Sequence, residues 1–271
     1  MLGGMSSLLE VQGVSKIYRT GGVWAQASGR GREVAAVRDV SFSVRAGQVF
    51  GVVGESGSGK STLARLILGI EAPSLGSVRF GGQDRSGSNG AAGRRARQRV
   101  QMVFQDPGGS LNPRKPVARV LDESLGLAGL PPNERSAAGV ALLRRVGLDE
   151  GIAQRYPHEL SGGQRQRVAI ARALAVSPEL VVADEPVSAL DVSLQAQIMR
   201  LLLELRDVLG LTLVFISHDL ALVHHLCDEM IVMQRGEVVE RGPPGIVLRQ
   251  PGHAYTRMLV DAVPRGQHQG R

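Results

Sequence analysis

Residues 54–61 read Gly54-Glu55-Ser56-Gly57-Ser58-Gly59-Lys60-Ser61, which fits the pattern G-x-x-x-x-G-K-[ST]. A short apolar run, residues 48–53, precedes the motif, and residues 61–69 follow with helical spacing of their apolar side chains. Glycines in such a loop let the backbone wrap a phosphate chain, so that its amides and the helix N-terminus face the phosphates. We expect Lys60 to reach the β- and γ-phosphates, Ser61 a magnesium ion and Thr62 the α-phosphate.

A second acidic motif, LVVADE, occupies residues 180–185. Its apolar part predicts a buried strand, and Asp184 at the strand's end can hold the water shell of a magnesium ion. Glu185, one residue further, can orient and deprotonate an attacking water. This arrangement favours a hydrolase over a kinase, although two acids at a strand end can also cap a helix.

A second phosphate-binding segment lies about a hundred residues after the first. It begins a predicted helix with a hydroxyl and two glycines, so that it presents free amides and a positive dipole end to an anion. Its residues are Ser161, Gly162, Gly163 and Gln164.

Strands alternate with helices along the chain, which predicts an α/β fold with a mostly parallel sheet. An N-terminal antiparallel β-subdomain is expected from strands at 8–14 and 34–44, joined by an exposed Gly/Arg-rich insert at 20–32 whose role the sequence does not reveal. Residues 117–175 predict an inserted helical subdomain. The other expected elements are strands at 48–53, 100–104, 180–183 and 211–216, a helical stripe at 194–205, a hairpin at 230–239 and a helix at 254–263.

The composition is that of a globular protein, with 43% hydrophobic and 21% charged residues among 271. The longest charge-free run, residues 208–218, is shorter than the roughly 18 to 20 residues that span a bilayer. A single cysteine and the absence of a secretory signal favour a reducing, cytoplasmic setting. The net charge of +7 permits a nucleic-acid partner, but with 3% aromatic residues we expect none.

Taken together, GESGSGKS, Gln105, LSGGQ, LVVADE, SALD and His218 resemble the ATP-binding subunit of an ABC transporter over nearly the whole chain. The resemblance implies a P-loop NTPase of ABC type that uses ATP and Mg²⁺. It also implies a head-to-tail dimer, in which the LSGGQ segment of one copy closes on the γ-phosphate held by Lys60 of the other. The ATPase domain would span residues 8–245, with the helical subdomain at about 116–176, and a short extension would follow at 246–271.

The same resemblance implies roles for four further side chains. Tyr18 would stack on adenine, Gln105 would sense the γ-phosphate, Asp191 would line the dimer seam, and His218 would contact the γ-phosphate in the closed state. The magnesium ligands would come from Ser61, Gln105 and Asp184.

Simpler interpretations stand beside these. Tyr18 can be an ordinary strand aromatic, since Trp24 lies in the same N-terminal stretch, and Gln105, His218 and Asp191 can serve as caps. A metal site formed by residues 224–227, which include two histidines and the cysteine, is disfavoured because neighbouring histidines on one short helix point in different directions.

Residues 103–114, 156–160 and 183–192 resemble the peptide and nickel importer branch of the family, as does the segment His-Ala-Tyr-Thr at 253–256. This branch implies that the transporter takes up its solute. It also implies that the ATPase subunit lies at the cytoplasmic face of the inner membrane. We slightly favour peptides over nickel. The lone cysteine argues against an iron–sulfur site.

Partners implied by the branch are two membrane permease subunits, a second ATPase subunit of the same or another kind and, indirectly, an extracytoplasmic solute-binding protein. Residues 112–119 are the candidate permease contact. A non-transport ABC ATPase acting on nucleic acid is disfavoured, because one phosphate loop is present and no heptad run is found. An exporter or lipid-extraction subunit stays a further alternative.

Overall fold

The computed structural model describes residues 7–20, 32–85, 95–104, 109, 111–186 and 191–262. The side chains of residues 20, 32 and 192 are not described. Two compact units make up the chain: unit 1 consists of Met1–Gly93 together with Phe215–Arg271, and unit 2 is Arg94–Val214. No helix of the described ranges combines the length and the apolar character needed to cross a bilayer.

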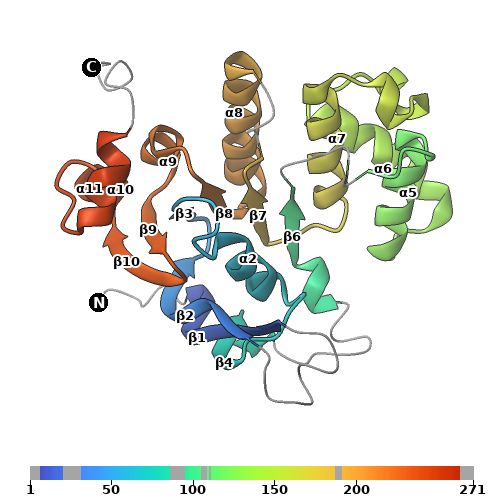
Figure 1. The fold of residues 1–271 in the computed structure, drawn as a ribbon. Coiled ribbons are helices and arrows are strands. Elements are labelled where there is room, and N and C mark those ends of the chain that lie inside the picture. The colour runs from blue at the N-terminus through green and yellow to red at the C-terminus, as the bar shows by residue number, and fades with distance from the viewer. Residues whose placement is uncertain are drawn as a thin grey trace, which may run out of the picture. The chain divides into compact units, whose positions relative to one another are not determined.

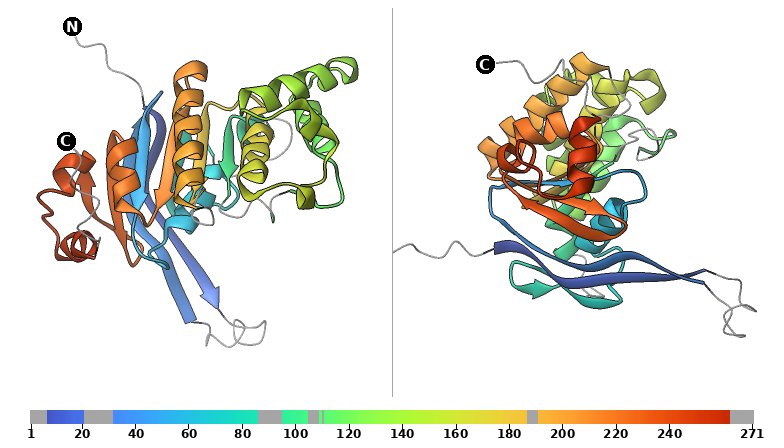
Figure 2. Two further views of the ribbon diagram at one scale, coloured as in Figure 1. Left: turned by 90° about the horizontal axis from the view of Figure 1, so that it is seen from above. Right: turned by 60° about the vertical axis from the view of Figure 1, so that its left-hand side comes forward.

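Unit 1 contains an antiparallel sheet of four strands in the order β2-β1-β4-β5. Figure 2 shows β1 and β2 as a long twisted ribbon. Val11 pairs with Phe42 on β2 and with Val78 on β4, and all three side chains are buried. This sheet confirms the expected antiparallel β-subdomain. Its strands are β1 (Ser7–Thr20), β2 (Arg32–Arg45), β4 (Leu75–Phe80) and β5 (Gln83–Asp84).

A second sheet has six strands in the order β10-β9-β3-β8-β7-β6, and three of them, β10, β9 and β3, belong wholly to unit 1. Strand β3 (Val49–Val53) is buried along its whole length and runs parallel to β9 (Glu229–Gln234), which pairs antiparallel with β10 (Glu237–Gly242). The rings of Phe42 and Phe50 stack with centroids 4.9 Å apart and join the two sheets of the unit. The helices of unit 1 are α2 (Lys60–Leu68), α9 (Leu220–Leu226), α10 (Pro244–Val247) and α11 (Ala254–Asp261) (Figure 1).

Unit 2 contains the parallel pair of β6 (Val100–Val103) and β7 (Leu180–Asp184), together with the predicted helical subdomain. Every residue of β7 before Asp184 is buried, as expected for a strand covered on both faces. Strand β8 (Thr212–Ser217) crosses the boundary between the units. The helices bounded in the described part of unit 2 include α5 (Val117–Leu127), α6 (Pro132–Arg145), η1 (Glu150–Gln154), η2 (Pro157–Glu159), α7 (Gly162–Leu174) and α8 (Val192–Leu209).

Candidate nucleotide-binding site

The predicted phosphate loop connects β3 to α2 in unit 1. Gly54 has φ 152°, and a Cβ there would lie 2.3 Å from the carbonyl oxygen of Met233 on β9. Gly59 has φ 107°, and its Cβ would lie 2.4 Å from the carbonyl oxygen of Ala36. Only glycine fits such positions without displacing backbone. The two neighbouring strands therefore fix both ends of the loop.

Lys60 lies at the start of α2 with only 6% of its surface exposed. Its Nζ donates to the carbonyl oxygens of Gly54 at 2.6 Å and Glu55 at 2.8 Å. No side chain caps the N-terminus of α2, whose next two residues are the exposed Ser61 and the half-buried Thr62. The amides of this first turn thus carry the positive end of the helix dipole and suit an anion.

Tyr18 lies on β1, and its hydroxyl donates to Oε2 of Glu71 at 2.6 Å. The Nζ of Lys16 lies 3.3 Å from the same oxygen and 5.3 Å from the centre of the tyrosine ring. Burial and the Glu71 hydrogen bond raise the pKa of Tyr18, while the side chain of Thr62 acts in the opposite direction. The structure therefore brings Tyr18 beside the phosphate-loop helix. Lys16 and Glu71 belong to no motif, so the sequence alone does not mark them as neighbours of Tyr18.

A contact from the C-terminal segment also reaches the loop. The hydroxyl of Tyr255 on α11 accepts a hydrogen bond from the amide of Glu55 at 2.9 Å, and Tyr255 is 5% exposed. In the sequence, this tyrosine stands out only as part of the segment at 253–256 that resembles the importer branch. The two residues lie 200 positions apart in the sequence, so no local sequence pattern predicts their contact.

His218 lies directly after β8 and is exposed. It occupies a turn in which the amide of Asp219 donates to Oγ of Ser217 at 2.9 Å. The carboxylate of Asp219 caps α9 by accepting from the amides of Ala221 and Leu222. Since Asp219 is the cap, His218 is left as an exposed residue of the turn.

Asp184 ends β7 in unit 2, and Glu185 follows it, both half-buried. Glu185 has φ 44°, a left-handed conformation that costs a non-glycine residue about 1 to 2 kcal/mol. Backbone strain of this kind gathers at functional sites, where the surrounding structure holds a side chain in one direction. The structure therefore places both acids at the partly exposed end of β7, and their roles in magnesium binding and hydrolysis stay predictions.

The segment Ser161–Gln164 begins α7 with a reciprocal cap. Ser161 Oγ accepts from the Gln164 amide at 3.3 Å, and Gln164 Oε1 accepts from the Ser161 amide at 3.0 Å. A Cβ on Gly163 would lie 3.1 Å from Leu194 on α8, so glycine permits close packing of the two helices. Asp191 caps α8 through the Leu194 amide at 2.9 Å. The LSGGQ segment and Asp191 are therefore brought together in unit 2.

Gln105 and the first part of the SALD motif, residues 188–190, lie outside the described residues. The role of Gln105 as γ-phosphate sensor and magnesium ligand stays a prediction. Of the other predicted site residues, unit 1 carries the phosphate loop, Tyr18 and His218, and unit 2 carries Asp184, Glu185, Ser161–Gln164 and Asp191.

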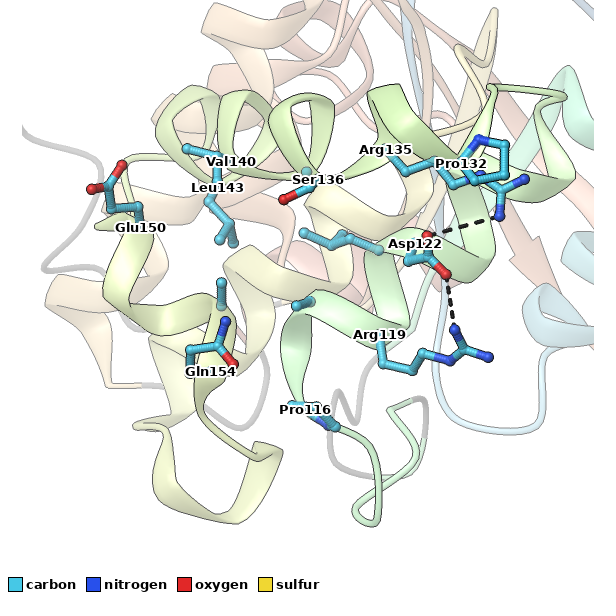
Figure 3. A pocket seen from close by; sticks show the side chains of 14 residues that line it. Pro116, Arg119, Asp122, Pro132, Arg135, Ser136, Val140, Leu143, Glu150 and Gln154 are labelled. Atoms are coloured by element: carbon cyan, nitrogen blue, oxygen red, sulfur yellow. Dashed lines mark hydrogen bonds and ion pairs between the residues drawn. The ribbon is translucent and has the colours of Figure 1, made fainter.

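A separate cavity of about 540 Å³ lies among α5, α6 and η1 in unit 2 (Figure 3). Arg119 and Arg135 both point to Asp122, at 3.1 Å and 3.8 Å. Leu143, one of its apolar lining residues, is fully buried, and Pro116 also lines the cavity. Pro116 and Arg119 belong to the candidate permease contact at residues 112–119.

Known proteins resemble this chain over most of its length. The ABC transporter family matches residues 37–188. The dipeptide transport ATP-binding protein DppF of Escherichia coli K12 is 48% identical over 86% of this chain and 70% of that protein. The probable peptide ABC transporter ATP-binding protein y4tS of Sinorhizobium fredii is 46% identical over 95% and 73%.

A solved structure resembles it in fold as well. The ATP-binding cassette MJ0796, a dimer in a post-hydrolysis state bound to ADP and Pi, is 29% identical, with a TM-score of 0.76 over 87% of this chain and 98% of that one. These matches confirm the fold class and the family expected from the motifs. The chain belongs to the ABC transporter family and carries its ATP-hydrolysing cassette.

Proposed function

We propose that this chain is the ATPase subunit of an importer that takes up dipeptides or oligopeptides across the cell membrane, and that the chain itself lies at the cytoplasmic face of the inner membrane. The observation that carries the proposal is the 48% identity to a dipeptide transport ATP-binding protein over 86% of this chain. Two membrane permeases, a second ATPase subunit and an extracytoplasmic solute-binding protein complete the assembly.

The phosphate loop binds the triphosphate in this proposal. The ammonium of Lys60 has three donors, and in the structure it bonds to carbonyl oxygens of the loop itself. It turns toward the β- and γ-phosphates, while the uncapped amides of α2 face the same chain. Tyr18 stacks on the adenine. This role is supported by its position beside Thr62 of the phosphate-loop helix and by the hydrogen bond through which Glu71 holds its hydroxyl.

A magnesium ion fits the donor set that these motifs supply. The hydroxyl of Ser61, the amide oxygen of Gln105 and the carboxylate of Asp184 are the hard oxygen ligands that Mg²⁺ prefers, alone or through its waters. When bound, the ion neutralises charge on the β- and γ-phosphates. The half-buried position of Asp184 at the end of β7 supports a charged ligand there.

Hydrolysis is assigned to Glu185 as the base that deprotonates the attacking water. Its left-handed backbone holds it just past the strand end. Gln105 and His218 contact the γ-phosphate from the same subunit, and Ser161–Gln164 contacts it from the partner, with Asp191 at the seam. A dimeric post-hydrolysis neighbour with a TM-score of 0.76 supports an arrangement of two copies.

The cassette would span residues 8–245, with the helical subdomain at about 116–176 and a short extension at 246–271. The permease contact includes the cavity among α5, α6 and η1. Its apolar lining and its charged rim of Arg119, Asp122 and Arg135 suit a short amphipathic segment from a membrane subunit (Figure 3). Residues 112–119 form one edge of that contact.

Uptake assays test the proposal in a strain of the source organism that lacks this gene. We expect loss of uptake of a radiolabelled dipeptide, restoration by the wild-type gene, and no restoration by Glu185→Gln, which still binds ATP but cannot activate water. Uptake of radiolabelled Ni²⁺ is measured in parallel. The proposal fails if uptake of the dipeptide and uptake of a radiolabelled oligopeptide are both intact in the deletion strain, and a selective loss of Ni²⁺ uptake would assign the chain to nickel import instead.

A further inference from the structure

The C-terminal helix α11 contacts the phosphate loop through one buried side chain. Tyr255 is 5% exposed, and its hydroxyl oxygen accepts the hydrogen bond from the Glu55 amide at 2.9 Å. Glu55 is the second residue of the loop that begins at Gly54. Both groups belong to unit 1, so the contact lies within one compact body.

The position of Tyr255 is itself fixed from two sides. Nδ1 of His253 accepts the Tyr255 amide at 3.2 Å and thereby caps α11. Glu240 on β10 accepts the amides of Gly252 at 2.8 Å and His253 at 3.1 Å. These hydrogen bonds attach the start of α11 to β10. They thereby hold Tyr255 in the position from which its hydroxyl contacts the phosphate loop.

Glu55 is bonded on both of its backbone groups. Its amide donates to Tyr255, and its carbonyl oxygen accepts from Nζ of Lys60 at 2.8 Å and from the Ser58 amide at 3.2 Å. Lys60 is the residue that must turn to the phosphates during binding, which costs some of its bonds to Gly54 and Glu55. The hydrogen bond with Tyr255 uses the amide of Glu55, whereas the bond with Lys60 uses its carbonyl oxygen, so Lys60 is not a partner in the Tyr255 bond.

We propose that Tyr255 is a positioning residue for ATP binding, which holds the entrance of the phosphate loop at Glu55 while Lys60 exchanges loop carbonyls for phosphate oxygens. The C-terminal segment thereby sets the affinity of the nucleotide site, although it lies outside residues 37–188, the range that the family matches. The inference concerns nucleotide binding and does not depend on which solute is imported.

The substitution Tyr255→Phe tests this, because it removes the hydroxyl and keeps the buried ring. Loss of one hydrogen bond that preorganises the loop should raise the dissociation constant for ATP and the KM by about three- to tenfold. The kcat at saturating ATP should stay unchanged, since the bond acts equally on the ground state and the transition state. Hydrogen–deuterium exchange should also become faster in peptides that cover residues 50–60.

Met258→Ala is the matched control, because Met258 lies on the same helix and is 50% exposed. It should leave the dissociation constant and the exchange rates as in the wild type. Thermal unfolding of both variants measures the effect on the fold alone. The proposal is overturned if Tyr255→Phe leaves ATP affinity unchanged, whether or not the melting temperature falls, or if Met258→Ala weakens ATP binding to the same extent. Because purified chain and ATP suffice, failure here is distinct from failure of peptide import.

Discussion

Tyr18 is a strand residue to which the proposed function gives a place in the nucleotide site. Nζ of Lys16 lies 5.3 Å from the centre of its ring, and its hydroxyl donates a hydrogen bond to Glu71. The hydroxyl therefore supports the fold, and in the proposed function the ring is the part offered to adenine. The two roles can be separated by substitution.

We predict that Tyr18→Phe lowers the unfolding free energy by about 1 kcal/mol through loss of the Glu71 hydrogen bond, and leaves the KM for ATP unchanged. Tyr18→Ala should raise the KM severalfold, because it removes the stacking surface. Steady-state ATPase kinetics and urea unfolding measure the two effects. Equal KM values for the Phe and Ala variants would contradict a stacking role.

At this scale, the sequence predicts the residues that belong to motifs and misses the residues that support them. Lys60, Glu185 and Ser161 could be found because their chemistry requires fixed neighbours along the chain. Glu71 and Tyr255 act through contacts 53 and 200 residues away in sequence, which no local pattern records.

At the scale of the element, β4 was not expected, although its sequence alternates. Its pairing with β1 depends on Gly76, which has φ 78° and lies against the backbone of β1. A Cβ there would be 2.3 Å from the carbonyl oxygen of Gly13 and 2.4 Å from that of Gln12. This close approach depends on the register of β4 against β1. Because the whole sheet sets that register, the local sequence of β4 does not reveal it.

We predict that Gly76→Ala lowers the unfolding free energy by about 2 to 4 kcal/mol, since it combines a left-handed backbone with a backbone clash. Gly82→Ala is the control: its φ is 75°, but no atom lies within 4 Å of a Cβ. This substitution should lower the unfolding free energy by only about 1 to 2 kcal/mol, which is the cost of the left-handed backbone for alanine. Equal losses in urea unfolding would show that the contact with β1 is unimportant.

The attachment of α11 to β10 should depend on pH. Burial raises the pKa of Glu240, but the side chain of Thr256 and the amides of Gly252 and His253 outweigh it, so that the folded value lies below 4.5. A carboxyl group whose pKa is lower in the folded than in the unfolded chain stabilises the fold at pH values above its unfolded pKa. That stability is lost as the pH falls through its folded pKa.

Unfolding free energies of the wild type and Glu240→Gln should therefore differ most above pH 4.5 and converge as the pH falls below it. Urea titrations across this range measure the difference. A difference that is independent of pH would mean that the carboxylate charge is not what ties α11 to β10.

At the scale of the whole molecule, the cassette divides its chemistry between two units. Unit 1 carries Lys60, and unit 2 carries Glu185 and the capped N-terminus of α7 at Ser161. The motifs predicted the family, because their combination is specific. They did not reveal which solute is imported, since in the proposed assembly the solute does not contact this chain.

The central claim is that each nucleotide is hydrolysed in a site built from two copies, with Lys60 from one and Ser161 from the other. Lys60→Ala and Ser161→Arg chains, each purified with a different tag, should be inactive alone. Mixed dimers isolated through both tags contain one intact site, formed by Lys60 of the Ser161→Arg copy and Ser161 of the Lys60→Ala copy. We predict that the mixed dimers hydrolyse ATP; mixed dimers as inactive as either parent would contradict the composite site.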